Sequence, residues 1–573
     1  MSDEPRASWD ARWGEALAVW SKLLRLSPPR WCETEEDERR EGLLESFAMI
    51  RSADHAVVLS ARQLRSRGLE RFPLEIMAHE IGHHVYCPGD LADYGRMLAR
   101  MRRGLPSREQ LAPMVANVYG DLLINDRLRR TAELDVPGVY RALAGDGDPG
   151  RFWTFIMRIY EHLWSLPRGS LAAAPADERL EVDAQLGARL VRAYAKDWVR
   201  GSGRFAALCY PYLDDDAERT GGMRGWADTA GLGRGAFPDG LTEIEDDEDA
   251  ALHPAFDPEL SGVEARPLPG AGGAGKKAAR RRSREIGEYG ELLRAMGVDA
   301  SPAAVARRYY RERALPHLVR YPSRRAPRGT EPLPEGLQPW EPGDPLERIE
   351  WVQTLVRSPV VVPGITTVER TYGASPGPEP RRDPVDLYVG IDCSGSMPNP
   401  QLQTSYPALA GAIVSLSALR AGARVKVVLS GEPGKTLAMP EFSRDEREVL
   451  EVLTSYLGTG TGFGVKRLAD TFDARTPRDH AVHVLLLSDS DLFALLDDRG
   501  SGESGWDVAR RSLAAARGGG TAVLQMPAGA QAGPVAHLEA DGWRVHYLSA
   551  WEDLIAFAHA FSRRAYDEHE ERP

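Results

Sequence analysis

Two spacings of apolar residues divide the chain. Up to about residue 235, apolar residues recur every three or four positions between short polar loops, as in GEALAVWSKLLRL and RFWTFIMRIYEHLWSL. This spacing predicts amphipathic helices. One strand-like run, HAVVLSARQL at 55–64, lies among them. We therefore expect a mostly helical α+β domain with a small sheet.

After residue 384 the pattern changes. Short, continuous apolar runs alternate there with stretches of helical spacing such as PALAGAIVSLSALRAG and WDVARRSLAAARGG. Apolar strands separated by helices are typical of a parallel sheet that is covered on both faces. We expect an α/β domain with a doubly wound sheet at 384–573. Its strands are predicted at VDLYVGID, RVKVVLS, AVHVLLLSDSD, GTAVLQM and WRVHYLS.

Composition separates these two domains. Residues 236–285 hold an acidic block, a Pro/Gly-rich stretch and the basic run KKAARRRSR, and they offer little apolar surface to bury. Such a segment predicts a flexible, charged linker. A helix pair and a Pro-rich extended stretch follow as a lead-in at 286–383. The sequence thus predicts a multidomain chain with parts at 1–235, 236–285, 286–383 and 384–573.

Charge and residue usage narrow the class of protein. The 573 residues exceed what one hydrophobic core supports, and no apolar run approaches the length of a membrane span. The formal net charge of −12 disfavours nucleic-acid binding. The acidic stretch MSDEPRASWDARWGEALAVW does not match a secretory signal, and the four cysteines are scattered without a CxxC pair. We expect reduced thiols and a cytoplasmic protein.

The stretch LEIMAHEIGHHVYCPGD combines helical spacing with metal-binding residues. Pro73 suits the first turn of a helix, and His79 and His83, four residues apart, project from the same helical face. Two neutral imidazoles in this arrangement are suited to one Zn²⁺. Glu80, beside the first imidazole, is placed to take a proton from a metal-bound water. The pattern predicts a catalytic zinc helix with Glu80 as the general base.

A catalytic zinc also needs a third protein ligand and an open fourth position. The stretch MVANVYGDLLINDRL predicts a second helix, on which Asn117, Asp121 and Asn125 share a face. Asp121 is the preferred third ligand. Asp90, on the loop after the first helix, is the alternative.

These two helices resemble those of a known class of enzymes. The HExxH pattern followed by a helix with Asn-x-x-x-Asp resembles the zincin metallopeptidases over about 55–130. The run NVYGDLLIND is especially similar to the metallopeptidase-like domains found beside bacterial von Willebrand factor A (VWA) domains. The resemblance implies a zincin-like domain at 1–235 that hydrolyses a protein or peptide substrate with Zn²⁺. Tyr86 and Tyr119 are candidates for stabilising the oxyanion of that reaction.

A second candidate site ends the strand predicted at VDLYVGID. Asp392, Ser394 and Ser396 follow one another as Asp-x-Ser-x-Ser, which on its own is also compatible with a simple polar turn. The motif resembles the metal-ion-dependent adhesion site (MIDAS) of VWA domains, which have a doubly wound, Rossmann-like fold. This resemblance covers about 384–570.

The MIDAS resemblance implies two further ligands. One is a threonine of the loop YLGTGTGFG, where Thr461 fits better than Thr459. The other is the last acidic residue, Asp489, at the end of VLLLSDSD, with Asp491 as a weaker substitute. Hydroxyl and carboxylate oxygens form a hard shell suited to Mg²⁺ or Mn²⁺, and the carboxyl ends of parallel strands are where such sheets bind ligands.

The same resemblance implies how the chain works with partners. In VWA domains an Asp or Glu of a protein partner completes the coordination of the MIDAS metal. Bacterial proteins with this kind of VWA domain commonly work with a MoxR-type AAA+ ATPase, and some occur in defence or conflict systems. This chain has no phosphate-binding loop of its own, because Leu429 stands where the stretch around Gly434-Lys435-Thr436 would need a glycine. We expect a hairpin there.

Two functions fit these observations. The first is a zinc-dependent peptidase whose VWA domain docks a partner or substrate through a divalent metal. The second is a non-enzymatic adaptor, in which the zinc is structural and the VWA site couples an AAA+ ATPase to its clients.

Overall fold

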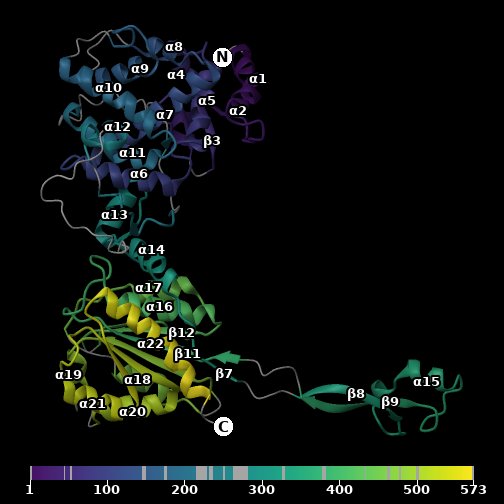
Figure 1. The fold of residues 1–573 in the computed structure, drawn as a ribbon. Coiled ribbons are helices and arrows are strands. Elements are labelled where there is room, and N and C mark those ends of the chain that lie inside the picture. The colour runs from purple at the N-terminus through teal and green to yellow at the C-terminus, as the bar shows by residue number, and fades with distance from the viewer. Residues whose placement is uncertain are drawn as a thin grey trace. The chain divides into compact units, whose positions relative to one another are not determined.

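The chain of the computed structural model divides into two compact units (Figure 1). Unit 1 comprises Met1–Glu312 with Gln401–Thr404, and unit 2 comprises Arg313–Pro400 with Ser405–Pro573. The boundary falls inside the predicted lead-in, 286–383. Both units combine helices with sheets that contain parallel strands, so the chain is a multidomain α+β protein.

Most of the chain is described by the structure. Within the described ranges, every helix is too short or too polar to span a bilayer. The described ranges are 3–43, 46–51, 54–144, 150–172, 177–213, 229–230, 237–249, 252–261, 282–325, 330–376, 382–432, 434–460, 465–476, 479–497 and 503–570.

Unit 1 contains a small sheet with the strand order β1-β3-β2-β4. Strand β3 is parallel to β1 and antiparallel to β2. The run predicted as one strand at 55–64 is divided between β3 and a helix, because the Ser60 hydroxyl accepts a hydrogen bond from Gln63 N and caps that helix. The strands are β1 (Arg30–Cys32), β2 (Ala48–Arg51), β3 (Ala56–Ser60) and β4 (Thr229–Ala230).

Helices make up most of unit 1, as the apolar spacing predicts. One of them, α7, lies inside the unit, with 14 of its 21 residues buried. The helices that begin in unit 1 are α1 (Asp3–Ala11), α2 (Trp13–Trp20), α3 (Glu35–Glu41), α4 (Ala61–Ser66), α5 (Pro73–Val85), α6 (Leu91–Gly104), α7 (Ala112–Ala132), α8 (Val136–Leu143), α9 (Gly150–Leu163), α10 (Glu178–Ala193), α11 (Trp198–Cys209), α12 (Pro258–Ser261), α13 (Ile286–Ala295) and α14 (Pro302–Ala314).

Helix α5 approaches α7 through a glycine. Gly82 of α5 faces Ile124 of α7 and Trp20 of α2. A Cβ added to Gly82 would lie 2.6 Å from Ile124 Cγ2 and 2.7 Å from Trp20 Cζ2. The missing side chain therefore permits a closer approach of the two helices than any larger residue would.

The described parts of 236–285 belong to unit 1 and take up secondary structure. Strand β5 (Glu243–Ile244) pairs antiparallel with β6 (Arg282–Ser283). Next to β6, Arg284 is buried and donates two hydrogen bonds of 2.8 Å to the Glu248 carboxylate. The acidic and basic blocks thus pair with each other, and bidentate ion pairs of this kind fix a segment that has few apolar side chains.

Unit 2 contains a sheet with the strand order β13-β12-β11-β14-β15-β16. All neighbours are parallel except β13, which forms the expected hairpin with β12. The other five strands coincide with the five predicted apolar runs. The strands are β11 (Asp386–Asp392), β12 (Val425–Ser430), β13 (Thr436–Ala438), β14 (Val482–Ser488), β15 (Arg517–Leu524) and β16 (Trp543–Tyr547).

Helices cover both faces of this sheet (Figure 1). Side chains of α18–α21 pack with strand residues such as Tyr388 and Leu486 in one buried cluster, while α16, α17 and α22 lie over the opposite face. The sheet is therefore doubly wound. Its helices are α16 (Tyr406–Arg420), α17 (Glu446–Leu453), α18 (Val465–Phe472), α19 (Asp491–Asp497), α20 (Gly505–Ala516), α21 (Ala532–Ala540) and α22 (Trp551–Glu570).

A two-stranded arm precedes β11. Strand β8 (Thr330–Pro339) pairs antiparallel with β9 (Val368–Pro376), and the short helix α15 (Trp351–Arg357) lies between them in sequence (Figure 1). Strand β7 (Ser323–Arg325) pairs antiparallel with β10 (Arg382–Pro384). The sequence predicts only an extended Pro-rich stretch here. The structure shows in addition that this stretch forms a hairpin and a short helix.

Replacing Gly82 by alanine should destabilise unit 1. The new Cβ would overlap Ile124 and Trp20, and overpacking of this kind costs about 1–3 kcal/mol. The free energy of unfolding, measured by urea denaturation of the full chain, reports the loss. Gly14→Ala is the matched control, because a Cβ at this helical glycine meets nothing within 4 Å. Equal stability of the two variants would contradict the close contact.

Candidate metal centre

Two imidazoles of α5 meet at the surface of α7. His79 and His83 stand one turn apart, and their Nε2 atoms are 3.3 Å from each other. The rings are nearly perpendicular, with an interplanar angle of 88°. The helical spacing therefore does bring both ring nitrogens to one point, as the sequence predicts.

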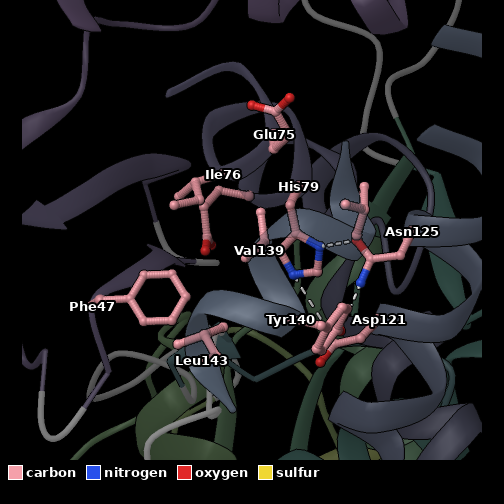
Figure 2. Close-up of a pocket in the computed structure, with 11 residues that line it drawn as sticks. Phe47, Glu75, Ile76, His79, Asp121, Asn125, Val139, Tyr140 and Leu143 are labelled. Carbon is pink, nitrogen blue, oxygen red and sulfur yellow. Dashed lines mark hydrogen bonds and ion pairs between the residues drawn. The ribbon is translucent and has the colours of Figure 1, made fainter. Parts of the chain in front are cut away.

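Asp121 of α7 completes a triangle of donor atoms. Its Oδ1 lies 3.5 Å from His79 Nε2 and 3.3 Å from His83 Nε2. For a tetrahedral metal with bonds of about 2.0–2.1 Å, two ligand atoms are separated by about 3.3 Å. The three observed separations match this value, so the group could hold a metal ion. Figure 2 shows His79 directed toward Asn125 and Asp121.

The other ring nitrogen of each histidine has a carbonyl partner. His79 Nδ1 donates to Asn125 Oδ1 at 2.8 Å, and His83 Nδ1 donates to the backbone carbonyl of Cys87 at 2.9 Å. An oxygen acceptor at Nδ1 keeps the proton there and leaves the Nε2 lone pair for a metal. Both imidazoles are therefore held in the tautomer that binds metal.

Asn125 is itself fixed by two tyrosines. Its amide Nδ2 donates to the hydroxyls of Tyr140 and Tyr160, each at 2.9 Å. The two hydroxyls are 2.8 Å apart and share a further hydrogen bond. This buried circuit holds the Asn125 amide with its Oδ1 facing His79 Nδ1 and its Nδ2 facing the two hydroxyls.

The Asp121 carboxylate is buried and ionised. Asn117 Nδ2 donates to Oδ2 at 3.3 Å, while Oδ1 makes no hydrogen bond within the described residues, its contacts to the two rings being long. Burial raises the pKa of Asp121, but His79 and His83 in their protonated form outweigh this and hold the pKa below the usual carboxyl value. A buried carboxylate oxygen without a hydrogen bond is costly, and a bound cation would remove that cost.

A pocket opens beside the metal-binding group. His79, Glu80 and Asp121 form its polar end, and Glu80 is only 1% exposed. Phe47 and Leu143 lie on the side of His79 away from Asn125 (Figure 2). The remaining lining residues are Glu75, Ile76, Asn125, Val136, Val139 and Tyr140. The pocket thus joins a metal group and a carboxylate to an apolar wall.

The other residues named from the sequence lie outside this group. Asp90 is exposed and caps α6, its Oδ1 accepting a hydrogen bond from Asp93 N at 2.8 Å. Tyr86 and Tyr119 donate to backbone carbonyls elsewhere, at 2.6 and 3.2 Å, and neither lines the pocket. The structure therefore brings Asp121, and not Asp90, to the imidazoles.

The sequence does not reveal the roles of Asn125 and Tyr140 at this site. The spacing Asp121 to Asn125 does place the amide on the correct face, one turn from the carboxylate. Tyr140 of α8 carries no such signal, since its approach to the pocket depends on how α8 packs.

The residues of the Asp-x-Ser-x-Ser motif are hydrogen-bonded to one another at the end of β11. Asp392 is buried; its Oδ1 accepts from Ser394 N at 3.0 Å and its Oδ2 from the Ser488 hydroxyl at 2.8 Å. The hydroxyls of Ser394 and Ser396 are 2.9 Å apart. Burial raises the pKa of Asp392, with the nearby charge of Asp489 adding to that rise. Oxygen atoms from both β11 and β14 thus converge here.

The loop residues named for this site are placed in part. Asp489 follows β14, and its Oδ1 accepts from Asp491 N at the start of α19, at 2.8 Å. Thr459 meets the motif through its backbone, whose carbonyl accepts from Gly395 N at 2.9 Å, whereas its hydroxyl accepts from Glu432 N. Thr461 lies outside the described residues. The Thr459 hydroxyl is therefore hydrogen-bonded to the loop that holds Glu432 and not to the motif.

No protein-family model matches the chain, and no curated protein or solved structure matches it. Its function must therefore be inferred from the geometry of the two sites.

Replacing Asn125 by alanine should weaken metal binding about 10- to 100-fold, the usual effect of losing a partner that orients a ligand. His79 would lose its acceptor at Nδ1 while all three metal donors remain. Competition with a chromophoric chelator measures the affinity for Zn²⁺. Asn399→Ala, the same substitution in unit 2, is the control. Unchanged affinity of the Asn125 variant would show that the circuit does not position His79.

Proposed function

We propose that unit 1 is a zinc-dependent peptidase. The observation that carries the proposal is the donor triangle of His79, His83 and Asp121, with sides of 3.3–3.5 Å, beside the buried Glu80. Two imidazoles and a carboxylate favour Zn²⁺ over Mg²⁺, which prefers six oxygens. Three protein donors also leave a fourth position open, as in catalytic zinc sites.

The residues around the triangle have the roles that peptide hydrolysis requires. When bound, zinc supplies a Lewis acid that acidifies its water and polarises the scissile carbonyl. Glu80 accepts the proton of the attacking water and delivers it to the leaving amine. Asn125 and Cys87 hold the two imidazoles in the metal-binding tautomer, and Asn117 orients Asp121. The apolar wall of the pocket receives a substrate side chain and excludes bulk water.

The non-enzymatic adaptor is the alternative. A structural zinc is normally enclosed by four protein ligands. Among the residues that the structure describes, the group has three members, and a pocket adjoins it. This open arrangement favours the peptidase.

For unit 2 we propose docking of a protein partner through Mg²⁺ or Mn²⁺ at the MIDAS-like motif. Strand order reverses between β11 and β14, and ligands of doubly wound sheets bind at the carboxyl ends of the strands at such a switch point. Asp392 and Ser488 end these two strands, and they are hydrogen-bonded to each other. The resemblance to VWA domains extends the proposal to an Asp or Glu of the partner as the remaining ligand, and to a MoxR-type AAA+ ATPase as that partner.

The purified chain should contain one zinc, which His83→Ala and Asp121→Ala should remove, as measured by inductively coupled plasma mass spectrometry. Glu80→Gln should keep the zinc and lose about 10²- to 10⁴-fold in hydrolysis of unfolded casein, because only the general base is removed.

Matched controls for this experiment lie close by. Glu75→Gln, on the same helix at the same pocket, and Asp90→Ala should retain both zinc and hydrolysis. A zinc-loaded wild type without hydrolysis would support the adaptor. Full activity of Glu80→Gln would show that Glu80 is not the general base. Absence of zinc from the purified wild-type chain would contradict the proposed zinc site.

Replacing Asp392 by asparagine should weaken Mn²⁺ binding to unit 2 at least tenfold. The amide keeps the size of the side chain but removes the charge that a hard cation requires. Electron paramagnetic resonance of free Mn²⁺ measures the affinity in the full chain saturated with Zn²⁺. Asp507→Asn, at a half-buried aspartate of α20, is the control. Equal affinity of the two variants would show that Asp392 is not a ligand.

A further inference from the structure

The tip of the β8–β9 arm, residues 340–367, exposes an apolar face. In the part of the chain that the structure describes, 20 large hydrophobic side chains are exposed, and 12 of them lie between Leu333 and Tyr372. Nine belong to the arm tip, with exposed fractions from 37% to 76%. Such a concentration in so short a segment marks an interaction surface, since exposed apolar residues are otherwise scattered singly.

Helix α15 at the tip is inverted relative to an ordinary amphipathic helix. Its buried residue is Thr354, with 0% exposure, whose hydroxyl accepts a hydrogen bond from Val368 N at 3.2 Å. The spacing of its apolar residues places them together on the opposite, outward face. They are Trp351, Val352, Leu355 and Val356. The helix therefore presents its hydrophobic stripe to the outside.

The inverted helix is nevertheless held in place. Trp340, Ile349 and Thr354 of the tip are buried, as is Val368 at the start of β9. The Trp340 ring donates to the Pro345 carbonyl at 3.1 Å, and Glu350 N donates to the Val368 carbonyl at 2.8 Å. The outward stripe is thus a formed surface on a small core of its own.

Charges at the two ends of α15 are complementary to each other. Glu347 and Glu350 precede the helix with Arg348 between them, and Arg357 ends it. Arg357 and Glu347 make no ion pair within the described residues, whereas Glu350 lies 3.4 Å from Arg370. If two α15 helices packed antiparallel on their apolar stripes, Arg357 of each would lie near Glu347 of the other.

We propose that the arm tip binds a second copy of this chain, with the two α15 helices antiparallel about a two-fold axis. The same patch then serves both copies, as a closed symmetric dimer requires. The nine exposed side chains offer on the order of 800 Å², which is about what each partner of a stable interface buries. Trp351, near the centre of the stripe, is the kind of residue that dominates such an interface.

A lipid surface fits the arm less well. Residues 330–376 contain seven acidic side chains against three arginines and no lysine. Anionic membranes attract basic segments and would repel this one. The antiparallel pairing instead uses both signs of charge.

The full chain should sediment as a dimer, at twice the 63.0 kDa of one chain, in analytical ultracentrifugation at micromolar concentration. Val352→Glu combined with Val356→Glu should raise the dissociation constant at least 100-fold, because it places four charges in an apolar contact. Val182→Glu is the matched control, since Val182 is also an exposed valine on a helix, 58% exposed. Circular dichroism confirms that each variant is folded.

Exchanging the charges of Arg357 and Glu347 distinguishes the antiparallel α15 dimer from dimers that form through another surface. Arg357→Glu alone should weaken the dimer about tenfold, and adding Glu347→Arg should restore it, because the opposite signs meet again. A monomeric wild type, a dimer that survives the valine substitutions, or a failure of the second exchange to restore it would each overturn the proposal. Flotation of a monomeric chain with phosphatidylcholine vesicles would assign the arm tip to lipid instead.

Discussion

The close approach of α5 to α7 is the contact on which the candidate metal centre depends. The two imidazoles come from α5, and the third donor, the Asp121 carboxylate, comes from the neighbouring helix α7. Gly82 permits this, since any side chain there would push against Ile124, the residue before Asn125. The glycine within the HExxH stretch is therefore as necessary to the geometry as the residues that would touch a metal.

Helical periodicity explains why the centre of this site is visible in the sequence. His79, His83, Asp121 and Asn125 each occupy a position that a spacing of four residues defines, and the only additional assumption is that two amphipathic helices face each other. Tyr140 and Tyr160 obey no such rule, because they reach Asn125 from two further helices whose packing angles the sequence does not state. The zincin and VWA resemblances themselves remain proposals.

In the fold, too, features set by a local sequence pattern are predictable, and features set by contacts between distant segments are not. The strands of unit 2 coincide with continuous apolar runs because both faces of the sheet are buried, which leaves little choice of secondary structure. The blocks around Glu248 and Arg284 show the opposite case. Composition predicts a linker there, but two charged segments that are far apart in sequence pair with each other. The sequence also did not predict helix α15 of the arm. Amphipathic helices are recognised because they bury their apolar residues, whereas α15 buries a threonine and exposes valines.

The acidic excess of the arm has a consequence for colloidal behaviour. A surface as apolar as its tip would be a site of nonspecific association if it were uncharged. Seven carboxylates against three guanidinium groups make random encounters between two arms repulsive, whereas the proposed antiparallel pairing would bring Arg357 near Glu347. This repulsion acts over about 10 Å at 0.1 M salt and over about 3 Å at 1 M. Low ionic strength therefore disfavours random association of the arms, and concentrated salt screens the repulsion between their apolar tips.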